Sequence, residues 1–401
     1  MSREKIAITD LRPGMYVVRP DISWIKAPLL YMEEGFISSE EEIAEIYRQG
    51  YREVYHDPSR MKPPAGENEP EELPAESTEA STTQQPTVPL NEEMGQAQSI
   101  YADSFDLVKN FMESSSIGTA DIAASQPYVE SIIGSLDRNA DALLSLAQLK
   151  TSDEYTYTHC VNVTIFAVAY AHFLNLPEDA LHLVGLAALF HDYGKSAIPS
   201  EVLNAPRQLT PEELTLMRSH VLLGYERLKK LPGIAPEILQ GAVQHHERHD
   251  GTGYPHKLSG KRIGVFGRII SISDNYDALV AKRVYKPSLA PTKALAIMYK
   301  MRGQAWASGW VERFIKMMGV YPVGSTVLLS TGEYGVVHAA NMTFPTQPKV
   351  LVITDAHGRP VADTHGIDLY KCPDISITRP LTHAEDKDID VEAFLSLPCN
   401  A

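Results

Sequence analysis

The chain has 401 residues and a formal net charge of −15, because 51 Asp and Glu residues outnumber 36 Lys and Arg residues. So acidic a chain lacks the basic surface needed to wrap a nucleic acid polymer, which excludes that class of partner. The three cysteines, Cys160, Cys372 and Cys399, form no CxxC pair. We therefore expect neither a thiolate zinc site nor a disulfide framework, as is typical of a reducing cytosol.

The first 58 residues alternate short apolar runs with turn signals. Arg12-Pro13-Gly14 predicts a turn, and the MYVV that follows it predicts a strand. Residues 38–49 predict a short helix with Ser39 as its N-cap. The opening MSREKIAITD has neither the basic segment nor the apolar core of a signal peptide. We expect a small α+β module over residues 1–58, with a regulatory or assembly role.

Residues 59–94 consist largely of Pro, Glu, Ser, Thr and Gln. Such a segment cannot bury enough apolar surface to offset its ordering entropy, which predicts an acidic disordered linker. From 95 to 320 the pattern becomes helical. The longest strongly apolar stretch there, 181–190, is far shorter than the ~20 residues that cross a bilayer. We therefore expect a helical domain, no membrane span and a cytoplasmic location.

The pattern changes again over residues 321–401. GSTVLLSTGEYGVVHAA and PKVLVITDAHGRPV predict hairpins with glycine-containing turns. A loose acidic tail is expected after them. The predicted fold class is therefore mostly α: a helical bundle with a small N-terminal α+β module and a small C-terminal β appendage.

Histidines and aspartates recur at five places in the helical region. A lone helical histidine is more often a satisfied core or surface residue, but the adjacent His191-Asp192 ends an apolar helix, where an unpaired carboxylate is costly. Together these groups suit hard-to-borderline metals bound by nitrogen and oxygen, and the absence of cysteine partners disfavours structural zinc. The set is His159, His191, Asp192, His220, His245, His246 and Asp274.

The context of His220 can be interpreted in more detail. Its helix is predicted to begin at Thr210, with Pro211 in the first helical position and Glu213 completing a capping box. His220 flanks an apolar stripe and so points partly inward, where either a core histidine or a ligand would sit. The stripe consists of residues 214, 217, 221, 225 and 228.

Two further features have both a functional and a plain interpretation. Side chains of neighbouring helical residues diverge, so His245 and His246 serve one site only if the helix ends there; otherwise they lie on the surface. Gly251, Gly253 and Pro255 flank Tyr254 and predict a loop that approaches a ligand closely or simply turns tightly.

These residues resemble the HD-GYP family, a branch of the HD phosphohydrolases. His191-Asp192-Tyr193-Gly194-Lys195 resembles its HDxGK segment, and HHERHDGTGYP (245–255) resembles its HHExxDGxGYP signature. DNYDAL (274–279), followed by Arg283 and Lys286, resembles the segment that closes the site. The resemblance covers about residues 95–318. More weakly, LRPGMYV near the start resembles a small module of uncharacterised function that precedes some HD-GYP domains.

The resemblance implies roles for individual residues. All seven residues of the set above correspond to metal ligands, with Asp192 as the bridging carboxylate. Lys195 corresponds to the lysine near the bridging water and a phosphate oxygen, and Tyr254 to the loop that lines the substrate pocket, where it could contact guanine. Arg283 and Lys286 correspond to phosphate-binding residues; without the resemblance they read equally as solvated basic residues.

The resemblance also implies an activity: hydrolysis of cyclic di-GMP to pGpG, by attack of a metal-bridging hydroxide on phosphorus. A second cleavage would give GMP, and the final product stays open between pGpG and GMP. Family members with three metals have a glutamate where this chain has Tyr155, and Glu154 is one helical step, about 100°, away. We therefore expect two divalent metals, iron or manganese, between which the donor types do not choose.

Two other functions stay open at this point. One is a cyclic di-GMP-binding or partner-binding signalling module with little turnover, which tightly bound metal without hydrolysis would support. The other is a phosphodiesterase for another cyclic dinucleotide or a nucleotide monophosphate, which faster turnover of that substrate would support. Protein partners are expected at the GYP loop or the N-terminal module, and a homodimer is a further option.

Overall fold

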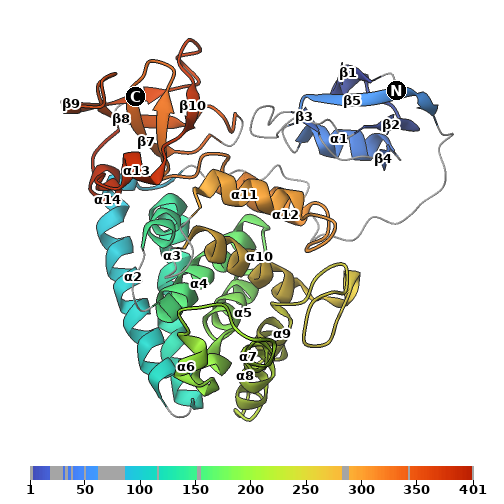
Figure 1. Ribbon diagram of the computed structural model, residues 1–401, viewed down its shortest axis with the longest axis vertical. Coiled ribbons are helices and arrows are strands. Elements are labelled where there is room, and N and C mark those ends of the chain that lie inside the picture. Colours follow the sequence, from blue (N-terminus) through green and yellow to red (C-terminus); the bar gives the residue numbers. More distant parts are fainter. Residues whose placement is uncertain are drawn as a thin grey trace.

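The fold is mostly helical, with a small sheet at each end of the chain, as predicted (Figure 1). It is taken from a computed structural model. The structure describes residues 3–18, 30–31, 35–37, 39–48, 51–61, 86–114, 117–150, 155–281, 289–341 and 344–399.

The N-terminal module is a sheet with one helix. Its strand order is β1-β5-β2-β4, and β3 pairs in parallel with β5. The predicted turn lies at Gly14, whose φ of 87° favours glycine. The predicted helix begins after Ser39, whose hydroxyl accepts the Glu42 N–H. The elements are β1 Glu4–Ala7, η1 Ile8–Asp10, β2 Met15–Val17, β3 Leu30–Tyr31, β4 Gly35–Phe36, α1 Glu40–Arg48 and β5 Glu53–Met61.

The helix α2 (Leu90–Glu113) begins inside the range expected to be linker, of which residues 62–85 lie outside the described part. Leu90, Met94 and Ala97 are buried at helical spacing. Glu93, which lies in the range predicted to be an acidic linker, is also buried and pairs with Arg138 of α3 (Thr119–Leu149) at 2.7 Å. A long-range partner therefore allows this acidic stretch to fold.

The bundle is built around α4, which packs against α2, α3, α5 and α10 (Figure 1). This helix is buried over almost its whole circumference, because its apolar residues follow one another without a polar face. Among the described residues, no helix is both long and apolar enough to cross a membrane. The elements are α3 Thr119–Leu149, α4 Tyr155–Phe173, α5 Glu178–Leu189, η2 Tyr193–Ala197, α6 Ser200–Leu203, α7 Pro211–Arg218, α8 His220–Leu228, α9 Pro236–Gln244, η3 Gly260–Arg262, α10 Val265–Val280, α11 Pro291–Lys300 and α12 Trp310–Met318.

The predicted single helix around His220 is two helices, α7 and α8, that meet at Ser219. The Ser219 hydroxyl donates to the Leu216 carbonyl, a local bond that competes with regular helix geometry. The capping box at Thr210 is present. The expected apolar stripe holds only in α8, since Val221 is fully buried whereas Leu214 of α7 is exposed.

The C-terminal appendage is a five-stranded antiparallel sheet with the order β10-β6-β7-β8-β9. Both predicted hairpins are present, as β6–β7 and β8–β9. The strands are β6 Thr326–Leu329, β7 Tyr334–Ala339, β8 Lys349–Thr354, β9 Pro360–Asp368 and β10 Ile377–Pro380.

The expectation of a loose acidic tail is wrong. After the short helix α13 (His383–Asp386), the helix α14 (Val391–Leu395) packs against α2 and α3. Leu395 is fully buried, and Glu392 accepts from Lys150 Nζ at 2.7 Å. The acidic composition of this segment obscured its few apolar side chains, which complete the core.

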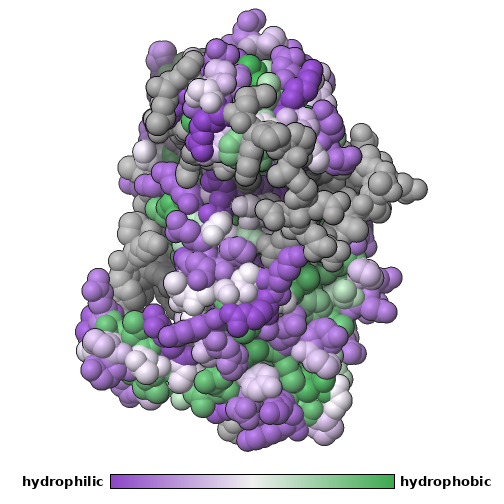
Figure 2. Space-filling model, turned by 90° about the vertical axis from the view of Figure 1, so that its right-hand side faces the viewer, coloured by the Kyte–Doolittle hydropathy of each residue, from purple (hydrophilic) through white to green (hydrophobic). Residues whose placement is uncertain are grey.

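The surface seen in Figure 2 is mainly hydrophilic, and green apolar residues lie between purple ones rather than in one broad face. Exposed apolar side chains on the helices next to His220 include Leu214, Leu216, Leu222 and Leu223.

Candidate metal centre

Three histidines are oriented in the same way by the backbone just before them. The Nδ1 of His191 lies 2.6 Å from the Ala188 carbonyl oxygen. The corresponding distances are 2.7 Å for His220 and 2.8 Å for His245, each to the carbonyl three residues earlier. A carbonyl oxygen only accepts, so each Nδ1 carries a proton and each Nε2 presents a lone pair. All three rings are thus preset as Nε2 ligands.

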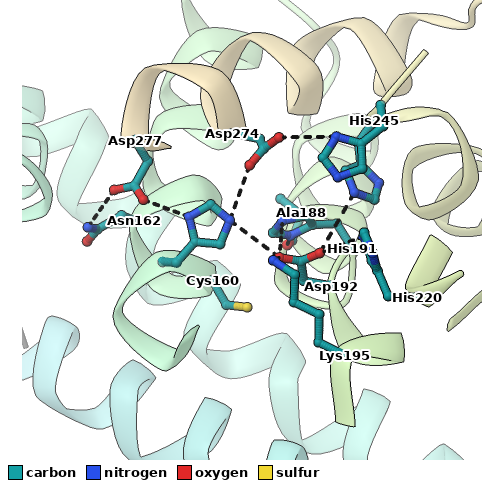
Figure 3. Close-up of polar contacts among 12 residues, drawn as sticks. Cys160, Asn162, Ala188, His191, Asp192, Lys195, His220, His245, Asp274 and Asp277 are labelled. Carbon is teal, nitrogen blue, oxygen red and sulfur yellow. Dashed lines mark hydrogen bonds and ion pairs between the residues drawn. The ribbon is translucent and has the colours of Figure 1, made fainter. Parts of the chain in front are cut away.

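These lone pairs converge on the carboxylate of Asp192 (Figure 3). Its Oδ2 lies 3.3 Å from His191 Nε2 and 3.4 Å from His159 Nε2. Its Oδ1 lies 3.1 Å from His220 Nε2 and 3.8 Å from His245 Nε2. Asp192 therefore belongs to two compact groups of donors, one on each oxygen. The first group is His159, His191 and Asp192, and the second is Asp192, His220, His245 and His246.

Asp274 lies beside both groups. From α10, its Oδ1 lies 3.2 Å from His159 Nε2 and its Oδ2 lies 3.6 Å from His246 Nδ1. The α9 helix ends at Gln244, so His245 and His246 do turn toward one site, with ring centroids 4.1 Å apart. The structure thus brings all seven predicted residues together.

Several of these buried atoms have no hydrogen-bond partner among the described residues: His191 Nε2, Asp192 Oδ1, His220 Nε2 and His245 Nε2. Leaving buried polar atoms unsatisfied is costly, and native proteins avoid it. A divalent cation on each side of Asp192 would satisfy all four at once. The nitrogen and oxygen donors therefore fit a binuclear metal site.

The protonation states also suit metal binding at neutral pH. Burial lowers the pKa of His245 well below its usual value and that of His246 to about 4, in the second case against the opposing effect of Asp274. Burial opposes ionisation of Asp192, but Lys195 and His191 outweigh it and hold its pKa well below the usual value. Neutral imidazoles and an ionised carboxylate are the ligand forms that metals require.

Close backbone packing explains the glycine of the HDYGK segment. A Cβ on Gly194 would lie 1.9 Å from the His220 carbonyl oxygen and 2.6 Å from Gly224 N. Glycine therefore lets η2 rest directly on α8. This contact joins the segment that carries Asp192 to the one that carries His220. Lys195, on η2, forms an ion pair with Asp192.

The GYP loop lies over the second group of donors. The Tyr254 ring stacks on His246 with centroids 4.7 Å apart, and Arg218 Cζ lies 5.1 Å from the Tyr254 ring centroid. Buried Glu247 accepts from the backbone N–H groups of His256 and Leu258 at 2.7 and 2.9 Å. The Glu of the signature thus holds the loop in place.

The predicted phosphate-binding residues Arg283 and Lys286 lie outside the described part of the chain, as does Glu154, which was not expected to replace the glutamate of the three-metal members. Others were missed by the sequence analysis. Arg218 had no signal, because nothing in the sequence indicates that it meets Tyr254. Asp277, which lies 2.6 Å from His159 Nδ1, had one: it is three residues after Asp274 and thus on the same face of α10.

Comparisons with known proteins agree with this arrangement. Residues 137–308 match the HD domain family, residues 3–122 a domain of unknown function, and residues 326–389 a KOW domain associated with the HD domain. The domain of unknown function thus extends over α2 and past the expected linker.

A cyclic di-GMP phosphodiesterase of Pseudomonas aeruginosa is 32% identical over 373 residues, which is 91% of this chain and 89% of that protein. The cyclic di-GMP phosphodiesterase response regulator RpfG of Xanthomonas campestris is 32% identical over 53% of this chain and 56% of its own length. The 3′3′-cGAMP-specific phosphodiesterase 2 of Vibrio cholerae is 40% identical over 40% of this chain and 31% of its own length. With its HDYGK and HHERHDGTGYP segments at one buried histidine–aspartate cluster, the chain belongs to the HD-GYP family of HD-domain phosphohydrolases.

Proposed function

We propose that the chain is a phosphodiesterase that hydrolyses cyclic di-GMP to pGpG and then to GMP. The observation that carries the proposal is the sharing of Asp192 by two groups of buried, unsatisfied donors. The choice of substrate rests on the Pseudomonas relative, which matches this chain through the HD domain and the domains on both sides of it.

Two ions of iron or manganese would be held by His159, His191, Asp192, His220, His245, His246 and Asp274, with Asp192 as the residue common to both donor groups. Such a pair of ions lowers the pKa of water toward about 7 and neutralises charge on the phosphoryl oxygens. The protein supplies a preset site for them, because the histidine tautomers are fixed by carbonyl acceptors and Asp192 is already ionised.

Other residues act on the substrate. Lys195 holds a positive charge beside Asp192, where it stabilises negative charge that gathers on the phosphoryl group. Tyr254, whose ring contacts both His246 and Arg218, is proposed to line the substrate pocket and to contact guanine. Arg283 and Lys286 follow α10 in the sequence and are proposed to contact phosphate, as in the family.

A second candidate substrate is 3′3′-cGAMP, because a Vibrio relative named for it is 40% identical over part of this chain. Cyclic di-GMP is favoured over it, since the relative that matches nearly the whole chain is named for cyclic di-GMP.

The test is a comparison of substrates on protein purified without oxygen and loaded separately with iron(II) and manganese(II). We expect pGpG and then GMP from cyclic di-GMP, a lower kcat/KM for 3′3′-cGAMP, and no product from His191→Ala. A higher kcat/KM for 3′3′-cGAMP would favour the second candidate. Bound metal with neither dinucleotide cleaved would contradict the enzyme and favour the binding module.

A further inference from the structure

A chain of buried polar side chains leads away from the metal centre toward α2. Asp277 Oδ2 lies 2.6 Å from His159 Nδ1, on the side of the ring away from Asp192. Asn162 Nδ2 donates to Asp277 Oδ1 at 2.8 Å, and the Tyr101 hydroxyl donates to Asn162 Oδ1 at 2.7 Å. All four side chains are buried. Figure 3 shows Asp277 and Asn162 on the far side of the site from Lys195 and His220.

The direction of every hydrogen bond in this chain is determined by chemistry. The Asp277 carboxylate only accepts, so His159 Nδ1 must carry the proton and Nε2 is left to face the two metal-site carboxylates. The same carboxylate can only accept from the NH2 group of the Asn162 side chain, so the amide oxygen of Asn162 points toward Tyr101. The hydroxyl of Tyr101 must then donate. The tautomer of His159 therefore depends, through Asp277 and Asn162, on Tyr101 of α2.

His159 differs in this respect from His191, His220 and His245. Those three are anchored on backbone carbonyls three residues earlier, so their orientation is fixed by their own segments. His159 is anchored by side chains from α10 and, through Asn162, from α2. The orientation of the His159 ring therefore depends on contacts between helices and not on its own segment alone.

Helix α2 stands apart from the catalytic segments in the sequence. Tyr101 lies within the match to the domain of unknown function, whereas His159, Asn162 and Asp277 lie within the HD match. The same helix touches the site a second time, because the Phe111 ring lies 4.7 Å from Phe190, which directly precedes His191. A segment outside the HD match therefore contacts the residue that precedes His191 and is linked by hydrogen bonds to His159.

We propose that Tyr101 is a positioning residue of the metal centre: through Asn162 and Asp277 it fixes His159, so that α2 sets the affinity of the ion held by His159, His191 and Asp192. The inference rests on the proposed metal site but not on which dinucleotide is cleaved. Partners of this kind behind a metal-binding histidine typically change metal affinity by about 10–100-fold when they are removed.

The test compares Tyr101→Phe with Tyr276→Phe in the full-length protein. Tyr276 is a matched control, because its buried hydroxyl also donates to a side-chain amide, that of Gln148 at 2.9 Å, but does not lead to a histidine of the site. Manganese(II) affinities of the two ions are measured by titration followed by electron paramagnetic resonance, together with the melting temperature of the metal-free protein.

We expect Asp277→Asn to lower the affinity for one of the two manganese ions about tenfold. Tyr101→Phe should lower the affinity for the same ion by a smaller factor and leave the affinity for the other ion unchanged. Tyr276→Phe should lower the melting temperature as much as Tyr101→Phe but leave both affinities at the wild-type value.

Wild-type affinities in Tyr101→Phe, or equal losses in Tyr276→Phe, would overturn the inference and leave the proposed function standing. A wild-type protein that binds no manganese would overturn both. A protein that binds two ions but cleaves another dinucleotide would refute only the choice of substrate.

Discussion

At the scale of single residues, the site is preset by backbone acceptors and burial. Three histidines have their protons fixed by carbonyl groups, and Asp192 offers one oxygen to each group of donors. The sequence pattern predicted that these histidines and aspartates form one cluster, and the family resemblance implied their role as ligands. Neither could predict their second contacts, since Asn162 and Tyr101 are recognisable as partners only when α2 is placed against α4.

The lowered pKa of His246 predicts how the metal-free protein responds to acid. Between its unfolded pKa near 6.5 and its folded pKa of about 4, the unfolded chain binds more protons than the folded one. His246 therefore contributes a loss of stability as the pH is lowered from 6.5 to 4, and His245 acts in the same direction, whereas Asp141, whose pKa is raised to about 6 by burial, acts in the opposite direction.

Chemical denaturation of chelator-treated protein at several pH values measures this slope. We expect His246→Asn to have a shallower slope than the wild type, since the contribution of His246 has been removed. Equal slopes in the two proteins would mean that His246 has the same pKa in the folded and unfolded states.

At the scale of elements, the site depends on contacts between short segments more than on the long helices. The break between α7 and α8 at Ser219 makes His220 the first residue of a helix, and the end of α9 turns two adjacent histidines to one side. The apolar spacing predicts one helix through Ser219, because the hydroxyl–carbonyl bond at the break does not alter that spacing.

The contact between η2 and α8 can be tested with a glycine pair. Gly194→Ala places a methyl group against the His220 carbonyl, so we expect a loss of about 1–3 kcal/mol in unfolding free energy and weaker metal binding by the His220 group. Gly95→Ala is the control, since a Cβ there meets nothing within 4 Å on the exposed side of α2. It should stabilise the protein by about 0.5–1 kcal/mol. Similar stabilities for the two variants would argue against the close packing.

At the scale of the whole molecule, the bundle includes parts that the sequence assigned elsewhere. The fold class was predicted correctly, because helical periodicity and hairpin signals are local. The start of α2 and the docking of α14 were not, because Glu93 and Glu392 are accommodated by the distant residues Arg138 and Lys150. The acidic composition of both segments masked these long-range pairs.

The docked C-terminal segment predicts a stability effect far from the metal centre. Leu395→Ala removes a fully buried side chain, so we expect a loss of about 2–5 kcal/mol in unfolding free energy, measured by urea denaturation. Leu397→Ala alters a side chain that is 38% exposed and should change stability by only about 0.5 kcal/mol. If both variants lost only a similar, small amount of unfolding free energy, α14 would not be part of the core in solution.

The central claim, that Asp192 bridges two ions, is tested most directly by counting manganese ions bound per chain in the wild type, Asp192→Asn and His220→Ala. Because Asp192 belongs to both donor groups and His220 to one, we predict two ions in the wild type, loss of both in Asp192→Asn, and selective weakening of one in His220→Ala. Retention of one ion with wild-type affinity in Asp192→Asn would contradict the bridging carboxylate and, with it, the binuclear site on which the proposed hydrolysis depends.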